Sequence, residues 1–229
     1  MAHAKYSLKQ IAKTIDHSLL KPEMTRDEVK VGCEIAKKYD VASVCCKPAD
    51  VKFCADLLKG TDVEIGTVVG FPHGSSTTQT KVFETKQAIA DGATEIDVVL
   101  NIGLLKSGLH KEVQDDIAAV VNAASGKAVK VILENAYLTE SEKVTACKLT
   151  EAAGADYVKT STGYAPTGAT IADIKLMRSS VSPKMKIKSA GGVRTLDVLM
   201  EYLDAGISRS GATTTSIMLD EYVERFGRD

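Results

Sequence analysis

The sequence lacks the features of a secreted or membrane protein. Residues 1–6 contain no apolar core of a signal peptide, and no apolar run is long enough to span a bilayer. The five cysteines are odd in number and include no Cys-x-x-Cys pair. This pattern predicts reduced thiols in a cytoplasmic protein.

An excess of charge of one sign is also missing. The formal net charge is −1, so no global field recruits nucleic acid or an anionic membrane. The four histidines never form a close pair, and no His/Cys cluster has zinc-ligand spacing. We therefore expect no nucleic-acid, membrane or metal partner, and any anion must be bound by a local site.

No linker or low-complexity tract divides the 229 residues, which predicts one domain over residues 1–229 with a short N-terminal extension and a polar tail after about Arg225. Short apolar runs alternate with amphipathic stretches. The expected strands are 14–18, 42–46, 64–71, 95–100, 130–135, 157–161, 186–190 and 207–211. The expected helices are 25–39, 49–59, 77–91, 111–125, 139–153, 170–179, 195–204 and 213–226.

Three of the segments that lead from a helix into a strand share one pattern. Each ends in a glycine suited to a left-handed helix C-terminus, namely Gly92, Gly154 or Gly206. Eight strands that alternate with eight helices predict an α/β fold, a parallel (β/α)8 TIM barrel. The rival is an open doubly wound sheet, but no Gly-x-Gly-x-x-Gly follows an early strand.

Ionisable residues recur on the predicted inner face of the barrel. If the apolar residues of each strand pack on helices, Asp97, Glu134, Lys159 and Lys188 point inward near the strand C-termini, where active sites of such barrels lie. Lys159 alone is compatible with a solvated lysine on an edge strand. The four together are compatible with an interior salt-bridge network or with groups that tune one another.

The second interpretation predicts a reactive amine. A neighbouring ammonium and desolvation lower the pKa of Lys159, so that its neutral form exists near pH 7 and attacks a carbonyl to form a Schiff base. Asp97 and Lys188 would then move the protons that carbon–carbon cleavage requires. This set of residues favours a carbonyl lyase.

Two loops are candidates for binding phosphate. Gly191 and Gly192 follow the seventh strand, and the stretch of Gly211, Ala212 and Thr213 leads from the eighth strand to the last helix. Backbone N–H groups and a helix N-terminus attract anions, and barrels commonly bind phosphate in these two loops. The alternative for Gly191 and Gly192 is a tight turn without a ligand.

Together these residues resemble the deoxyribose-phosphate aldolases, a family of class I aldolases, over nearly the whole chain. The resemblance implies reversible cleavage of 2-deoxy-D-ribose 5-phosphate to acetaldehyde and D-glyceraldehyde 3-phosphate, without a cofactor. It implies that Lys159 forms the Schiff base, that Asp97 and Lys188 transfer protons, and that Thr162 and the two glycine-containing loops bind the substrate's hydroxyl and phosphate groups. The resemblance is carried by segments 15–22, 70–72, 95–99, 158–163 and 188–195.

The chain departs from the family's usual residues at three places. Cys46 and Lys47 follow Cys45, Asn135–Tyr137 follow Glu134, and residues 209–214 replace a serine-containing loop. We expect Lys47 and Tyr137 to reshape the pocket. A Schiff-base barrel aldolase for another phosphorylated sugar therefore remains an alternative, as does a non-catalytic sugar-phosphate-binding barrel, although binding alone does not need a neutral lysine.

Other residues have two interpretations each. Asp16, next to His17, could join the substrate site or brace the barrel, and Cys45 could lie near the pocket or be an inert thiol. Arg194 and Arg209 could assist phosphate binding or pair with carboxylates. The outer helices show no apolar stripe that separates from the core, so the sequence does not decide the oligomeric state, and a homodimer remains open.

Overall fold

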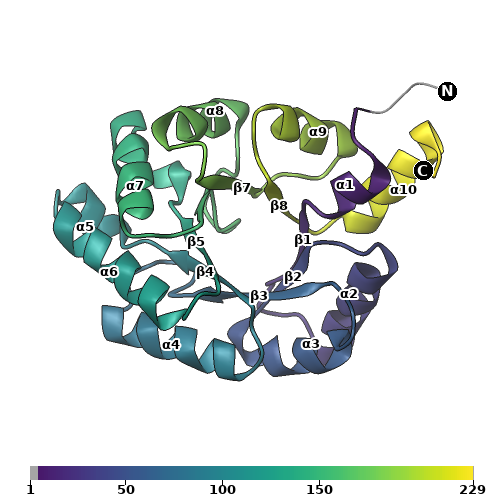
Figure 1. Cartoon of the computed structure of the whole chain (residues 1–229), viewed down its shortest axis with the longest axis horizontal. Helices are drawn as coiled ribbons and strands as arrows, with labels where there is room; N and C mark the ends of the chain where they lie inside the picture. The colour runs from purple at the N-terminus through teal and green to yellow at the C-terminus, as the bar shows by residue number, and fades with distance from the viewer. Residues whose placement is uncertain (1–4, 229) are drawn as a thin grey trace.

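The computed structural model describes residues 5–228 and contains a closed barrel of parallel strands in chain order (Figure 1). Each predicted strand is present, with some shifted ends, so the (β/α)8 prediction is confirmed. The strands are β1 (Ile15–Leu19), β2 (Ser43–Cys46), β3 (Glu64–Val69), β4 (Glu95–Val99), β5 (Ala128–Ile132), β6 (Tyr157–Lys159), β7 (Lys186–Ala190) and β8 (Arg209–Ala212).

Helices surround the barrel (Figure 1), and all eight predicted ones are present. They are α2 (Arg26–Lys38), α3 (Val51–Leu58), α4 (Thr78–Ala90), α6 (His110–Ala123), α7 (Glu140–Ala152), α8 (Ile171–Ser180), α9 (Leu196–Asp204) and α10 (Thr215–Phe226). Two short helices, α1 (Leu8–Ala12) and α5 (Ile102–Lys106), and two 3-10 turns, η1 (Pro48–Asp50) and η2 (Asn135–Tyr137), were not expected from the sequence.

The helix boundaries follow from local chemistry. Thr139 begins α7 with a reciprocal capping box in which its hydroxyl accepts from the backbone N–H of Glu142, while the Glu142 side chain accepts from the backbone N–H of Thr139. Gly92, Gly154 and Gly206 have φ values of 109°, 83° and 105°, as the repeated pattern predicts. These glycines end α4, α7 and α9 and turn the chain into the next strand.

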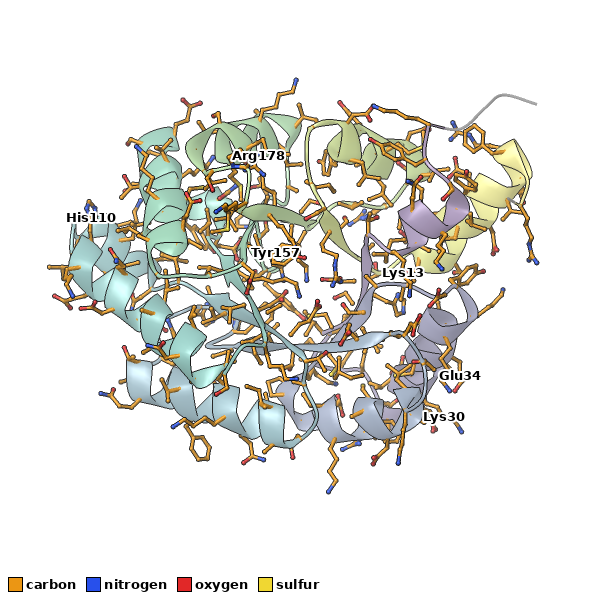
Figure 2. All side chains as sticks on the ribbon, in the orientation of Figure 1. Lys13, Lys30, Glu34, His110, Tyr157 and Arg178 are labelled. Carbon is orange, nitrogen blue, oxygen red and sulfur yellow. The ribbon has the colours of Figure 1, made fainter. Side chains whose placement is uncertain are left out.

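Side-chain alternation sorts the strands into an apolar outer face and a charged inner face. Ile96, Val98 and Ile187 belong to the buried apolar core between the strands and the helices. Asp97 and Lys188 alternate with them and are also buried. Figure 2 shows side chains filling the centre of the barrel, with Tyr157 among them, whereas Lys30 and Glu34 project outward from α2.

Strand β5 ends earlier than predicted. It stops at Ile132, and Glu134 adopts a left-handed backbone conformation with φ 55° before η2 begins. Glu134 therefore does not continue the inward-facing row of β5, and its side chain is directed by this turn. In the described part of the chain, no helix is long and apolar enough to cross a membrane.

Candidate active site

One carboxylate lies at the centre of the charged inner face. Asp97 Oδ2 lies 2.6 Å from Lys159 Nζ and 2.7 Å from Lys188 Nζ, and Asp97 Oδ1 lies 3.2 Å from Lys130 Nζ. These four side chains come from β4, β5, β6 and β7. All four residues are at most 2% exposed.

Two more carboxylates surround the same cations. Asp16 Oδ2 lies 2.5 Å from Lys188 Nζ, and Glu95 Oε2 lies 2.7 Å from Lys130 Nζ. Arg209 contacts both Asp16 and Glu95. Within the described residues, this cluster joins three carboxylates to four cations: Asp16, Glu95 and Asp97 against Lys130, Lys159, Lys188 and Arg209. The cluster thus contains one more cation than carboxylates.

The environment singles out Lys159 as the cation that can lose a proton. Burial lowers the pKa of Lys159, and the charge of Lys188 adds to this effect, against the opposing attraction of Asp97. Burial also opposes the charge of Lys188, but Asp16 and Asp97 outweigh it and raise the pKa of Lys188 well above the usual range. Burial likewise disfavours the charge of Asp97, but Lys130, Lys159 and Lys188 hold its pKa well below normal.

Lys159 and Lys188 line a cavity of about 480 Å³ at the barrel mouth. Seven of the predicted substrate-binding residues line the same cavity: Cys45, Thr162, Gly191, Gly192, Gly211, Ala212 and Thr213. Arg194 is exposed at its edge. A lysine with a lowered pKa, a second lysine with a raised pKa and a carboxylate therefore meet beneath a cavity that is open to a small polar substrate.

The loop after β7 needs glycine. Gly191 and Gly192 have φ values of 79° and 85°, a region that other residues rarely adopt. A Cβ on Gly191 would lie 2.9 Å from Gly168 Cα, and Ala169 N donates to Gly191 O at 3.0 Å. The close approach of the segment around Gly168 thus fixes this loop beside the cavity.

Thr162 is held by two partners. Its hydroxyl donates to Glu134 Oε2, and its Oγ1 accepts from the backbone N–H of Tyr164 at 3.0 Å. Thr162 N also donates to Glu134. Glu134 is buried and binds Thr162, a residue of the cavity lining, across the loops that follow β5 and β6, and it is not one of the carboxylates of the Asp97 cluster. The remaining lone pair of Thr162 can only accept a hydrogen bond from a substrate.

Asp16 was predicted to bind substrate, but it does not line the cavity. Its side chain is fully buried beneath Lys188 and beside Arg209, where it balances their charges. His17 lies on the other face of β1, where Nδ1 lies 2.8 Å from Thr215 Oγ1. Burial lowers the pKa of His17 to about 4, so this histidine is neutral at pH 7.

Cys45 is a buried free thiol at the floor of the cavity, and its Sγ lies 4.0 Å from Asp97 Oδ2. Burial and the charge of Asp97 raise the pKa of this thiol, which keeps it protonated. Both interpretations of Cys45 therefore hold in part, because it is near the pocket but is a poor nucleophile.

The two departures expected to reshape the pocket do not reach the Lys159 cavity. Tyr137 is 50% exposed on η2 and does not line it. Lys47 Nζ donates to Met24 O at 2.8 Å and lies 3.4 Å from Asp50. Lys47 lines a separate, neighbouring cavity.

Lys130 and Glu95 are members of the cluster that were not singled out from the sequence. Lys130 contacts all three carboxylates, and burial of its charge is outweighed by Asp97 and Asp16, which raise its pKa. A signal was available, because Lys130 alternates with the apolar Val129 and Val131 on its strand. Its register opposite Asp97 on β4 places the two side chains together.

Comparisons with known proteins agree on one family. The model of the DeoC/LacD family of aldolases matches residues 10–223. The chain is 52% identical to deoxyribose-phosphate aldolase of Staphylococcus epidermidis, over 88% of this chain and 92% of the relative. It is 53% identical to deoxyribose-phosphate aldolase of Bacillus mycoides, over 92% of this chain and 96% of the relative.

Solved structures are similar to the whole barrel. The deoxyribose phosphate aldolase from Aeropyrum pernix superimposes with a TM-score of 0.88 at 28% identity, covering 94% of this chain and 92% of the other. The aldolase QR15 superimposes with a TM-score of 0.90 at 32% identity, covering 94% of this chain and 96% of the other.

Proposed function

Because the chain belongs to the DeoC/LacD family of aldolases, we propose that it reversibly cleaves 2-deoxy-D-ribose 5-phosphate to acetaldehyde and D-glyceraldehyde 3-phosphate through a Schiff base on Lys159. The observation that carries this proposal is the sharing of Asp97 Oδ2 by Lys159 and Lys188. Of these two lysines, Lys188 alone has a second carboxylate at short range among the residues that the structure describes, namely Asp16 at 2.5 Å. Lys188 therefore keeps its proton, and Lys159 supplies the neutral amine.

The first half of the reaction forms the Schiff base. Lys159 Nζ attacks C1 of the open-chain sugar, the attacking nitrogen loses one of its protons and the aldehyde oxygen takes one, which gives a carbinolamine. A second proton then converts this hydroxyl to water, which leaves as the iminium forms. Lys188 is the proposed proton donor because it is a protonated group within the same buried cluster.

The second half breaks the carbon–carbon bond. Loss of the proton from the C3 hydroxyl lets the C2–C3 electron pair move toward the iminium, which releases D-glyceraldehyde 3-phosphate and leaves an enamine. Protonation of C2 and hydrolysis of the new iminium then release acetaldehyde and regenerate Lys159. Asp97 is the proposed acceptor in these transfers, working with Lys188 and with water in the cavity.

The phosphate end of the substrate is assigned to the two glycine-containing loops that line the cavity. We place it against Gly191, Gly192 and the loop of Gly211, Ala212 and Thr213, because exposed backbone N–H groups in such turns bind anions. Arg194 adds a positive charge at the rim. Thr162 accepts a hydrogen bond from a substrate hydroxyl, and Cys45 forms part of the floor.

Reductive trapping tests this function. The protein is incubated with 2-deoxy-D-ribose 5-phosphate and sodium borohydride, and the modified peptide is identified by mass spectrometry. An adduct on Lys159 is expected, together with loss of turnover in Lys159→Ala without unfolding, since Asp97 retains Lys130 and Lys188. Residual activity of Lys159→Ala within about tenfold, a barrier change near 1.4 kcal/mol, would contradict the covalent role. Tight binding without a reducible adduct would favour a non-catalytic binder instead.

Assembly and location are further parts of this proposal. We infer that residues 1–229 act as one catalytic domain in the cytoplasm, supported by five free, buried thiols. A homodimer is our proposed assembly, although the structure of the Aeropyrum pernix relative is tetrameric. Light scattering of the protein as it elutes from a size-exclusion column distinguishes a monomer, a dimer and a tetramer by mass.

A further inference from the structure

A buried tyrosine on α9 is bonded to the segment that leads from β6 to α8. Tyr202 is 8% exposed, and its phenol O–H donates to the backbone carbonyl of Ala169 at 2.8 Å. Tyr202 does not line the Lys159 cavity, and no step of the proposed reaction uses it. The hydrogen bond therefore joins an outer helix to the segment that contains Thr162, a residue of the cavity lining.

The backbone of Ala169 is bonded on two sides. Its N–H donates to Ala190 O and Gly191 O, both at 3.0 Å, at the end of β7, while its carbonyl accepts from Tyr202. Helix α9, which carries Tyr202, begins directly after the loop that follows β7. Ala169 thus connects the two ends of this loop, the strand end through its N–H and the helix through Tyr202.

Gly168 brings the same backbone into direct contact with the loop. A Cβ at this position would lie 2.3 Å from Gly191 O and 2.8 Å from Gly191 Cα, distances at which the atoms overlap. Gly168 does not have a positive φ, so the close approach, and not the backbone conformation, requires glycine here. No side chain separates the two segments, and a displacement of Ala169 is therefore passed directly to Gly191.

The loop after β7 has two backbone donors that the protein itself does not use. Gly192 and Val193 line the cavity, and their N–H groups have no acceptor in the described part of the chain. A hydrogen bond weakens steeply when the N–H group does not point at the acceptor. Binding of a phosphate by several such N–H groups therefore depends on how firmly the loop is held.

We propose that Tyr202 is a positioning residue for recognition of the substrate's phosphate. Through Ala169 it fixes the loop of residues 191–193, so that the N–H groups of this loop converge before the substrate arrives. This inference rests on the proposed function, in which that loop binds the phosphate of 2-deoxy-D-ribose 5-phosphate. Because Tyr202 lies outside the cavity, its loss should weaken phosphate binding and leave the Schiff-base chemistry in place.

Tyr202→Phe removes the donor and keeps the ring. The readout is the ratio of kcat/KM for 2-deoxy-D-ribose 5-phosphate to kcat/KM for 2-deoxy-D-ribose, which lacks the phosphate. Loss of one hydrogen bond should lower this ratio about threefold to tenfold through a higher KM for the phosphorylated sugar, with its kcat within about twofold. Gly168→Ala, which pushes the loop out of place, should lower the ratio by at least about tenfold.

Tyr222→Phe is the matched control. Tyr222 lies on the next helix, is 1% exposed, and donates its O–H to a backbone carbonyl, that of Tyr6, at 2.7 Å. It does not line the cavity, so this variant loses a hydrogen bond of the same kind without touching the loop. Its urea midpoint should fall about as far as that of Tyr202→Phe, whereas its ratio of kcat/KM values should stay unchanged.

Borohydride trapping of acetaldehyde on Lys159 is measured in every variant. The absence of an adduct in the unaltered protein would overturn the proposed function. An adduct in every variant, with a ratio in Tyr202→Phe that matches the ratio in Tyr222→Phe, would overturn the positioning role of Tyr202 alone. A ratio that falls in Tyr202→Phe through kcat, with KM unchanged, would also overturn it, because the loss would then lie outside phosphate binding.

Discussion

Lys159 and Lys188 contact the same carboxylate oxygen, Asp97 Oδ2, at 2.6 Å and 2.7 Å. One negative charge cannot fully offset two buried ammonium groups. The two lysines differ in whether a second carboxylate lies nearby. Lys188 also has Asp16, whereas Lys159 has no other carboxylate within ion-pair distance among the described residues. This asymmetry assigns the proton to Lys188 and the nucleophile to Lys159.

Replacing Lys188 by methionine tests the asymmetry. Removal of its charge should raise the pKa of Lys159, because that charge now disfavours the Lys159 ammonium. The midpoint of the pH dependence of borohydride trapping of acetaldehyde should therefore move to a higher pH. Lys186→Met is the control, since Lys186 is an exposed lysine on the same strand. A midpoint that stays in place or moves downward would refute the assignment.

Asp97→Asn should weaken the fold as well as the chemistry. The carboxylate binds Lys130, Lys159 and Lys188, and its loss leaves buried cations with too little compensation. We expect the free energy of unfolding to fall by about 3–5 kcal/mol. Urea denaturation at pH 7 measures this loss, with Lys159→Ala as a variant that leaves no carboxylate unpaired. Equal stability of Asp97→Asn and the unaltered protein would show that the cluster does not depend on this charge.

His17 should make the fold sensitive to mild acid. Its pKa is lowered to about 4 by burial, against about 6.5 in an unfolded chain. Between these pH values the unfolded chain binds a proton that the folded protein does not, so stability falls as the pH decreases from about 6.5 to about 4. This group alone contributes a loss of about 3 kcal/mol over that range.

Urea midpoints at pH 7 and pH 4.5 check the effect, and His17→Asn should lose less stability across this interval than the unaltered protein. Asn can keep a hydrogen bond to Thr215 without titrating. The carboxyl groups of Asp16 and Asp97 have lowered pKa values, so their stabilising contribution is lost only at still lower pH. An identical pH dependence in both proteins would mean that the pKa of His17 is the same in the folded protein and in the unfolded chain.

Glu134→Ala should impair recognition of the sugar more than Schiff-base formation. Thr162 loses the acceptor of its hydroxyl and of its backbone N–H. We expect KM for 2-deoxy-D-ribose 5-phosphate to rise about tenfold, or about 1.4 kcal/mol, while trapping of acetaldehyde on Lys159 persists. Glu134→Gln retains an acceptor oxygen and should show a smaller increase. A lost acetaldehyde adduct with an unchanged KM would place Glu134 in the covalent chemistry.

The barrel was predictable because its signals are local and repeated. Period-two alternation, capping residues and left-handed glycines such as Gly92 define the strand–helix units without tertiary information. The early end of β5 was not predictable in this way. Glu134 leaves the strand to reach Thr162, which lies in a loop that follows another strand.

The site was predictable at Asp97, Lys159 and Lys188, because their inward direction follows from alternation along β4, β6 and β7. The structure brings these three side chains together, while their catalytic roles remain a proposal. The inward direction of Lys130 follows from the same alternation, but its pairing with Asp97 depends on strand register, which a single sequence does not contain.

The central claim is that Lys159, and not Lys188, loses its proton. A titration of the two lysines tests it most directly. Protein labelled with ¹³C at lysine Cε is titrated by NMR, and the Lys159 signal is assigned from its absence in Lys159→Arg. We predict that Lys159 titrates below the ordinary lysine value of 10.5 while Lys188 stays charged beyond it. A Lys159 that remains protonated above pH 10.5, or a Lys188 that loses its proton first, would contradict the account.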